Sequence, residues 1–549
     1  MVMLIRSTPN ICRCVTAMLA LLPVALAGDV AVSWRPGTGQ ARLIAPSLKG
    51  PMSGIVVNTI HEYTAEKYGW TFPVARTDAG EGLNIVAGDA QNNSLISRLG
   101  RDGADVRTAD LGEEGFRIVT FEKSRKKYVL LLAQTPAGLK YACQELLYFH
   151  MPVSRDAASV DWPMNITRKP QFAYRGIYIL PCWAQHDSVE HWRRVLKFNS
   201  EISCNRNYFW LDGFPLLPQY GGEYGDTDLA KAGNVRSLIE LSKREGMKFL
   251  IGGGWDTWHQ RKLFNGDIRK SVQYYLDLQH LLPGAEGIYL EPVGEGTERT
   301  DPKESLRSVE AIRELANTIW RDRPDFEFAI AAGKFNPRVY LDALDSIDRN
   351  RVYWTWGWGD PLTDNAPAIH PQVLRWHTIV KMSEWHGSND APRPDEVTLP
   401  GFYTSYDPGM GFGNLWNGRG YGVGTGVPAA REFDPYTIPY FAHEYWFRDR
   451  AWDVNETRDQ FRSRLARRLF DADMPAEAIN HYLALHDMSQ TPRQGSESFL
   501  APIERFTTKF AGAGTARNQD TIRRMQEAIS GLRQVRPLPE KKKTSQSSE

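Results

Sequence analysis

The acidic side chains best placed for chemistry are Glu291 and Glu295, which end and follow an expected strand over residues 286–291. Glu295 stands between Gly294 and Gly296, where glycine lets the backbone bend tightly. Two carboxyl groups this close raise each other's proton affinity, so one of them can remain a protonated acid. Hydrolysis of a glycosidic bond generally needs such an acid and a second carboxyl group. We therefore expect Glu295 to be a general acid and Glu291 to be a catalytic residue beside it.

A partner carboxylate on the opposite side of the scissile bond has to come from another strand. Asp360, after an expected strand over residues 351–356, is the first candidate for this catalytic role. Asp256 and Glu384 are the alternatives, and their spacing does not choose among the three. Asp212 follows another expected strand, and we expect it to bind a substrate hydroxyl.

Tryptophan is unusually frequent, with 17 in the chain, and 15 of them lie between Trp162 and Trp452. A flat apolar ring beside carboxylate and amide groups matches a sugar, which has flat C–H faces edged with hydroxyls. Because the rings recur at expected strand ends, we predict a carbohydrate substrate. The residues expected to bind it, with Asp212, are Trp210, Trp255, Asp256, Lys334, Asn336, Trp356, Trp358 and Trp416.

A repeated strand–helix unit has to position these residues, and we expect it over residues 166–452. Apolar runs predict strands over 174–180, 206–211, 247–252, 286–291, 326–332 and 351–356, with two more within 397–406 and 412–425. Eight strands alternating with helices predict a (β/α)8 TIM barrel, whose active-site residues lie at the carboxyl ends of the strands. A doubly wound open sheet is the alternative, but no glycine-rich phosphate turn follows the first strand.

Two further units flank the expected barrel. A small α/β domain is predicted over residues 28–165, from strand patterns at 84–88, 116–121 and 127–133 and a helix at 139–149. Pro163 and Pro170 mark 161–171 as a linker. After the barrel, residues 453–535 are expected to be helical, with helices at 456–469, 475–485 and 520–532. The polar, lysine-rich end at 536–549 is typical of disorder.

The N-terminal segment has the features of an export signal. Arg6 and Arg13 provide positive charge, Val15–Ala27 is apolar, and Ala25–Ala27 is a small-residue cleavage pattern. We predict removal of residues 1–27 and a periplasmic or secreted protein. A retained N-terminal anchor is the alternative.

Composition and motif searches limit the partners, disulfides and cofactors to be expected. The chain has 549 residues, with 66 Lys and Arg against 65 Asp and Glu, so charge gives no reason to expect a nucleic acid or an anionic membrane as partner. Cys143, Cys182 and Cys204 remain after signal removal and form no disulfide framework. A Cys182–Cys204 bridge is an option, but we expect buried free thiols. The sequence has no His-Glu-x-x-His, no P-loop and no Gly-x-Ser-x-Gly, and we expect no cofactor and no metal.

Three segments of the first domain resemble a known family. Leu111–Ile118, the strand at 128–133 and Gly138–Ala142 are similar to the N-terminal domain of α-glucuronidases. The same type of domain precedes the barrel in β-hexosaminidases. The resemblance covers about residues 30–150 and implies an accessory domain in front of a glycosidase TIM barrel.

The barrel carries a weaker resemblance to the same family. In α-glucuronidases the general acid is a Glu in a Ser-Glu-Gly stretch just past the fourth strand, and Gly294-Glu295-Gly296 occupies a similar place. The resemblance therefore implies Glu295 as the acid. Glu291 stands where that family has a Lys, and an anion there would repel a uronate. The adjacent Asp-Glu pair of hexosaminidases does not follow the fourth strand, which disfavours their substrate-assisted N-acetyl mechanism.

Together these patterns predict an exported glycoside hydrolase that cleaves O-glycosidic bonds of a poly- or oligosaccharide. The main alternative is a non-catalytic glycan-binding protein on a degenerate glycosidase barrel, because the partner motifs are missing. A barrel enzyme of another class, such as a lyase or a metal-dependent hydrolase, is the third interpretation.

Overall fold

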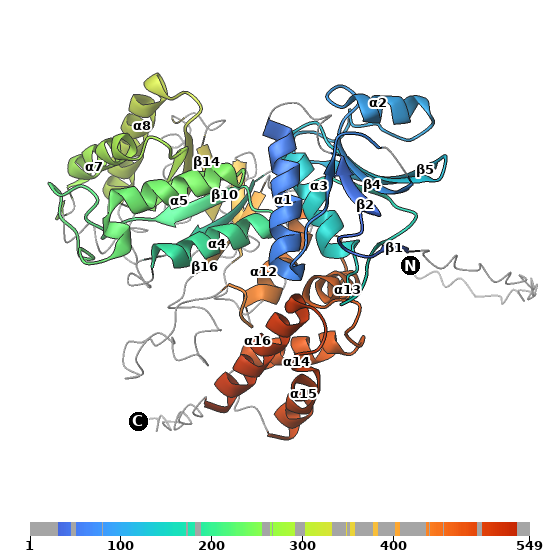
Figure 1. The fold of residues 1–549 in the computed structure, drawn as a ribbon. Coiled ribbons are helices and arrows are strands. Elements are labelled where there is room, and N and C mark those ends of the chain that lie inside the picture. The colour runs from blue at the N-terminus through green and yellow to red at the C-terminus, as the bar shows by residue number, and fades with distance from the viewer. Residues whose placement is uncertain are drawn as a thin grey trace, which may run out of the picture.

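The computed structural model of the chain contains an N-terminal mixed sheet, a parallel barrel and a C-terminal group of helices (Figure 1). It describes residues 31–44, 51–78, 81–171, 174–179, 181, 188–254, 264–265, 267–290, 302–331, 347, 352–356, 377–382, 401–406, 435–438, 440–453, 455–490 and 497–534. The predicted export signal at 1–27 and the predicted disordered end at 536–549 lie outside these residues.

The N-terminal sheet has six strands in the order β3-β2-β4-β6-β5-β8. Their bounds are Ala41–Ile44 for β2, Val74–Ala75 for β3, Gly82–Gly88 for β4, Phe116–Lys123 for β5, Lys126–Leu132 for β6 and Asn165–Arg168 for β8. β5 is antiparallel to β6 and β8, and the other pairs are parallel. Two further strands, β1 (Val32–Trp34) and β7 (Ala158–Val160), pair with each other.

Helices cover both faces of this sheet. α1 (Pro51–Tyr68) and α3 (Pro136–Phe149) pack together in the main core, whereas α2 (Ser94–Arg101) packs in a separate core. Ile85 of β4 belongs to the first core and Val86 to the second, as the alternation of side chains along a strand requires. The strands and the helix expected at 84–88, 116–121, 127–133 and 139–149 are confirmed.

The expected linker over 161–171 is partly wrong. Residues 165–168 form β8, and Ile166 is the register partner of Ile118 in β5. The sheet therefore continues beyond residue 165. Pro163 and Pro170 flank a short strand at the edge of the sheet, a position where proline is tolerated because few ladder bonds are lost.

Eight parallel strands, β9 to β16, form a closed barrel. Their bounds are Tyr174–Ile179 for β9, Arg206–Trp210 for β10, Lys248–Gly253 for β11, Gly287–Leu290 for β12, Glu327–Ala331 for β13, Val352–Trp356 for β14, His377–Met382 for β15 and Gly401–Tyr406 for β16. β16 pairs with β9 along six residues, which completes the ring. The mixed α/β class is thus observed with a barrel at its centre.

Six of the eight expected barrel strands are confirmed within a residue of their predicted ends, and β16 lies inside the expected 397–406. The seventh strand is β15 at 377–382, which we did not predict. We expected the remaining strand within 412–425, and those residues lie outside the part that the structure describes. Pairing with β14 and β16 defines β15, and such long-range pairing is not visible in a six-residue sequence window.

Helices follow the first four barrel strands: α4 (Val189–Glu201), α5 (Ala232–Arg244), α7 (Ile268–Leu281) and α8 (Pro302–Asp322), with a short 3-10 turn, η2 (Asp228–Ala230), before α5. Their apolar sides pack on outward-facing residues of the strands. The ring of Trp192 in α4, for example, lies 5.6 Å from that of Phe209 in β10, and Trp320 in α8 lies 5.3 Å from Phe328 in β13.

Cys143 and Cys204 are buried free thiols, as expected, and Cys182 lies outside the described residues.

The C-terminal helices are α12 (Tyr440–Trp452), α13 (Arg458–Leu469), α14 (Ala478–Gln490), α15 (Glu497–Phe510) and α16 (Ala516–Gln534). α13 begins with a capping box in which Thr457 and Gln460 satisfy each other's backbone N–H groups. The helices expected at 456–469, 475–485 and 520–532 are confirmed, and α12 and α15 are additional.

Buried ion pairs join the N-terminal domain to the C-terminal helices and to the barrel. Glu145 in α3 is fully buried and accepts hydrogen bonds from Arg464 of α13 at 2.8 and 3.0 Å and from Arg448 of α12 at 3.2 Å. Arg168 of β8 lies 3.2 Å from the same carboxylate. Burial alone would raise the pKa of Glu145, but these guanidinium groups outweigh it and hold the pKa well below its ordinary value.

A second buried contact joins the first domain to the barrel. Arg175 in β9 is fully buried and donates to Glu114 at 2.9 Å, and Asn205 donates to the other oxygen of Glu114 at 3.1 Å. Burial raises the pKa of Glu114, and the nearby Arg175 charge lowers it by more. A loop of the N-terminal domain therefore ends in an ion pair beneath the amino ends of β9 and β10.

The Glu145 contact predicts a large effect of a small substitution. Glu145→Gln keeps the shape but removes a buried carboxylate that Arg448 and Arg464 share, so that Asp449 is left as their nearest counter-charge. Loss of a buried charge partner costs about 3–5 kcal/mol. Urea unfolding should show a clearly lower midpoint than in the native chain. The matched control is Glu81→Gln, at an exposed pair with Arg125, which should change the midpoint little. Equal midpoints for both variants would contradict this assignment.

His150 predicts a pH dependence of stability. Its ring nitrogens lie 3.1 Å from Asp161 and 3.6 Å from Glu145. Burial lowers the pKa of His150, but the two carboxylates outweigh burial and raise it above the ordinary 6.5. This stabilisation is complete below about pH 6.5 and is lost as pH rises through the higher folded-state pKa. The stability difference between the native chain and His150→Gln should therefore be larger at pH 6 than at pH 8, and an equal or reversed difference would refute the assignment.

Candidate functional site

The candidate site lies at the rim formed by the carboxyl ends of the barrel strands. Side chains in the barrel interior form layers below this rim. Arg206 of β10 binds Glu327 of β13 with two hydrogen bonds of 2.9 and 2.8 Å near the amino ends of the strands. Burial raises the pKa of Glu327, but Arg206 and Lys248 lower it by more. This buried ion pair occupies the barrel interior at the end opposite the rim.

The next interior layer is aromatic. The rings of Tyr208 in β10 and Tyr289 in β12 lie 5.4 Å apart, although these two strands are not neighbours in the sheet. Gly176 of β9 leaves the space that the Tyr208 ring fills, since a Cβ there would overlap that ring. Trp210 lies two residues beyond Tyr208, on the same face of β10. It is therefore directed to the inside of the barrel at the rim, and it is 5% exposed.

Asp212 connects the end of β10 to the end of β11 by hydrogen bonding. It is buried, and it accepts hydrogen bonds from the backbone N–H of Gly254 at 2.9 Å and from the hydroxyl of Tyr275 in α7 at 3.3 Å. Gly253, at the end of β11, has no room for a side chain because a Cβ would overlap the Tyr275 hydroxyl. Burial, followed by the negative charge of Asp212, raises the pKa of Tyr274, so that this phenol stays protonated. These contacts give Asp212 a positioning role, and binding of a substrate hydroxyl by Asp212 stays a prediction.

Most residues predicted to act on the substrate lie outside the part of the chain that the structure describes. β12 ends at Leu290, and Glu291 and Glu295 follow it in the sequence. β14 ends at Trp356, whose backbone pairs with Val380, and Trp358 and Asp360 follow in the sequence. The other predicted residues outside the described part are Trp255, Asp256, Lys334, Asn336, Glu384 and Trp416. Of the predicted residues, the structure therefore describes the side chains of Trp210 and Asp212, at and just after the end of β10, and the roles of all of them stay predictions.

Sequence reasoning did not find the partners of Asp212. The run Gly252–Gly254 was a usable signal, because three glycines at a strand end indicate close approach of other groups. Tyr275 carried no such signal, since its hydroxyl reaches Asp212 only when α7 packs beside β11.

Among the described residues no group of three or more His, Cys, Asp or Glu side chains could hold a metal ion. In the same part of the chain no helix combines the length and apolarity needed to cross a membrane.

Comparison with known proteins shows a shared fold. No protein-family model and no curated protein matches the chain. A GH20 β-N-acetylhexosaminidase from Streptomyces coelicolor A3(2) is 12% identical, with a TM-score of 0.54 over 80% of this chain and 92% of that one. A β-hexosaminidase from Streptomyces plicatus, solved with GlcNAc, is 12% identical, with a TM-score of 0.55 over 80% and 91%. A chitobiase from Flavobacterium johnsoniae is 10% identical, with a TM-score of 0.53 over 92% and 88%.

These likenesses cover most of each structure, so the chain shares the sheet-plus-barrel fold of these glycoside hydrolases. At 10–12% identity, this structural similarity shows a shared fold alone. The substrate and the roles of individual residues have to be argued from this chain itself. The similarity is to structures of the hexosaminidase type, and the resemblance to α-glucuronidases stays a prediction.

Asp212 predicts graded effects of two substitutions. Asp212→Ala leaves the Gly254 N–H and the Tyr275 hydroxyl without this acceptor, which costs about 1–3 kcal/mol for the buried donor alone. Asp212→Asn keeps an acceptor oxygen and the same shape, so it should be clearly milder. Thermal unfolding of both variants checks the order. An alanine variant as stable as the asparagine variant would show that these hydrogen bonds do not hold the rim.

Proposed function

We propose that this protein is an exported glycoside hydrolase whose active site lies at the carboxyl ends of the barrel strands. The observation that carries the proposal is the closed parallel barrel behind a mixed sheet, a fold shared with GH20 glycosidases. In this fold the strand carboxyl ends form the reactive face. Glu291 directly follows β12, the fourth strand of the barrel, and Glu295 lies four residues further along the sequence.

The proposed chemistry needs only carboxyl groups and water. Glu295 donates a proton to the glycosidic oxygen as the bond to the anomeric carbon breaks. The second carboxylate, Asp360 or Glu291, activates the incoming water or attacks the anomeric carbon itself. In the first case the configuration inverts, and in the second a covalent intermediate forms and is then hydrolysed.

The proposed substrate is an oligo- or polysaccharide bound by aromatic rings at the rim. Trp210 supports this proposal, because it is directed to the barrel interior at the strand end. The comparison structures are named for N-acetylhexosamine substrates. This chain has Glu-Pro-Val-Gly-Glu directly after β12, where no adjacent Asp-Glu pair follows, so we do not extend N-acetyl specificity to it. Glu291 similarly disfavours a uronate, since both groups are anionic.

Export is part of the proposal and rests on the sequence of residues 1–27. A glycosidase that acts on polysaccharides meets them outside the cytoplasm, so a periplasmic or secreted location is consistent with the function.

The competing function is glycan binding without catalysis on the same barrel. It shares every structural feature described above and differs in the absence of turnover.

Substitution of the proposed acid tests the mechanism. Glu295→Gln should lower kcat by about 10²–10⁴-fold on the glycoside that the native chain hydrolyses fastest, because general acid catalysis contributes about that much. Glu310→Gln, which removes the same charge from an exposed position on α8, is the matched control and should keep full activity. Hydrolysis that survives unchanged in Glu295→Gln would show that another group is the acid.

A further inference from the structure

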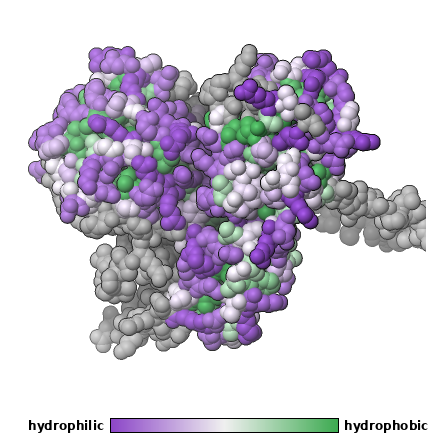
Figure 2. All heavy atoms as spheres, viewed as in Figure 1, coloured by the Kyte–Doolittle hydropathy of each residue, from purple (hydrophilic) through white to green (hydrophobic). Residues whose placement is uncertain are grey.

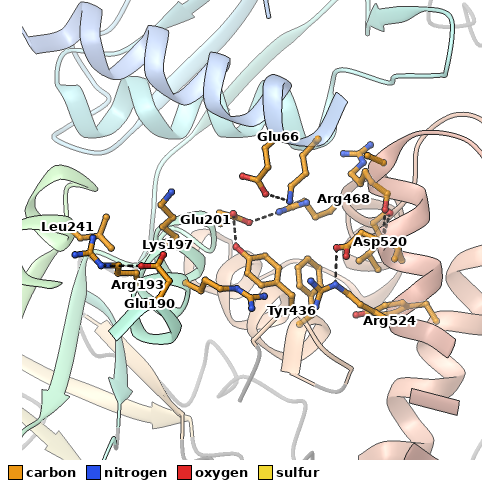
Figure 3. Close-up of a pocket in the computed structure, with 18 of the residues that line it drawn as sticks. Glu66, Glu190, Arg193, Lys197, Glu201, Leu241, Tyr436, Arg468, Asp520 and Arg524 are labelled. Atoms are coloured by element: carbon orange, nitrogen blue, oxygen red, sulfur yellow. Dashed lines mark hydrogen bonds and ion pairs between the residues drawn. The ribbon is translucent and has the colours of Figure 1, made fainter. Parts of the chain in front are cut away.

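A cavity of about 590 Å³ lies where the N-terminal domain, the barrel and the C-terminal helices meet (Figure 3). Its walls come from α1, α4, α5, Tyr436 and the helices α12, α13, α14 and α16. It runs along the side of α4 that is turned away from the barrel core. Figure 2 shows that hydrophilic side chains dominate the face of the molecule viewed in Figure 1.

The cavity has an excess of positive charge. Eight of its lining side chains are Lys or Arg, and four are Asp or Glu. The whole chain is nearly balanced, at 66 basic and 65 acidic residues, so the excess is a local property. It arises from the fold, because α4 turns Trp192 and Leu196 to the barrel core and Arg193 and Lys197, four residues apart, outward.

Several of these cations already have acidic partners. Arg468, which is buried, donates to Glu201 at 2.6 Å, and Arg524 donates to Asp520 at 2.9 Å. Arg193 lies 3.5 Å from Glu190. Figure 3 shows Arg193 paired with Glu190 along one wall, and Arg468 and Tyr436 both donating to Glu201. The acids of the cavity are thus engaged with cations of its own walls.

Two exposed cations remain without an ion pair among the described residues, Lys197 of α4 and Arg244 of α5. Their helices pack side by side, and both side chains line the same cavity. Glu245 also interacts electrostatically with Lys197, but its carboxylate is already bound by Lys140 at 3.0 Å. Like charges that line one cavity repel each other. A ligand with negative charge would remove this repulsion and gain contacts with both groups.

We propose that this cavity binds a small phosphate-bearing ligand, held by Lys197 and Arg244 at the junction of the three parts. A phosphate ester carries about −1.5 to −2 charges at pH 7, so one such group matches the combined charge of Lys197 and Arg244 better than a carboxylate does. Arginine binds phosphate oxygens through two parallel N–H donors, and lysine binds them as a compact point charge. A cavity of this volume accommodates a ligand of sugar-phosphate size. None of the residues proposed for the active site is among those that line this cavity.

Calorimetric titration of the full chain with inorganic pyrophosphate tests the proposal, with sodium chloride at matched ionic strength as the blank. We expect saturable binding and a rise in Tm that saturates with it, since a ligand of the folded state stabilises it by mass action. The double substitution Lys197→Ala and Arg244→Ala should weaken binding by at least about tenfold, because each lost charged contact is worth a large factor in affinity. Both side chains are exposed, so the variant should fold, with a Tm no lower than that of the native chain without ligand.

The matched control is the double substitution Lys270→Ala and Arg321→Ala, which removes two exposed cations from α7 and α8 outside the cavity. It should bind pyrophosphate as the native chain does. The proposal is overturned if the native chain shows no saturable binding, or if both double variants weaken binding equally. A titration with sulfate forms a second arm, and binding as tight as that of pyrophosphate would overturn the assignment of a phosphate-bearing ligand.

Discussion

The pairing of β16 with β9 is the constraint on which the rest of the structure depends. Six consecutive residue pairs, from Gly401 with Tyr174 to Tyr406 with Ile179, close the parallel sheet on itself. A closed sheet leaves no strand edge, so every strand has two hydrogen-bonded neighbours. Closure also forces all eight carboxyl ends onto one rim, and residues far apart in the chain meet there. The pairing of Glu295 with Asp360 proposed for this protein needs such a meeting, because these two residues follow different strands.

Buried charges join the N-terminal domain to this barrel and to the C-terminal helices. Glu114 reaches Arg175 in the first barrel strand, and Glu145 binds Arg448 and Arg464 of the C-terminal helices. A carboxylate is costly to bury without its partners. The Glu114 pair is therefore favourable only when the N-terminal domain and the barrel are in place, and the Glu145 pair only when the N-terminal domain and the C-terminal helices are. The same arrangement brings α1, α4 and α16 around the cationic cavity, which no single segment of the sequence contains.

The fold was more accessible to sequence reasoning than the site. β4 and β6 are buried on both faces, and their continuous apolar runs made them visible. β15 has a His and a Lys among its six residues, and its two neighbouring strands define it rather than its own composition. At the rim, the position of Asp212 after a strand singled it out, but its bond with Tyr275 depends on how α7 packs. Glu145 has an ordinary helical sequence around it, and its burial follows from arginines more than 300 positions away.

A hydrolysis screen of the mature chain from Gly28 against a broad panel of plant, algal and host glycans tests the central claim most directly. Binding to each glycan should be measured on the same samples. The account predicts release of reducing sugar from at least one glycan, with that glycan bound as well. Binding of a glycan without turnover of any of them would contradict the hydrolase and support a glycan-binding protein on the same barrel.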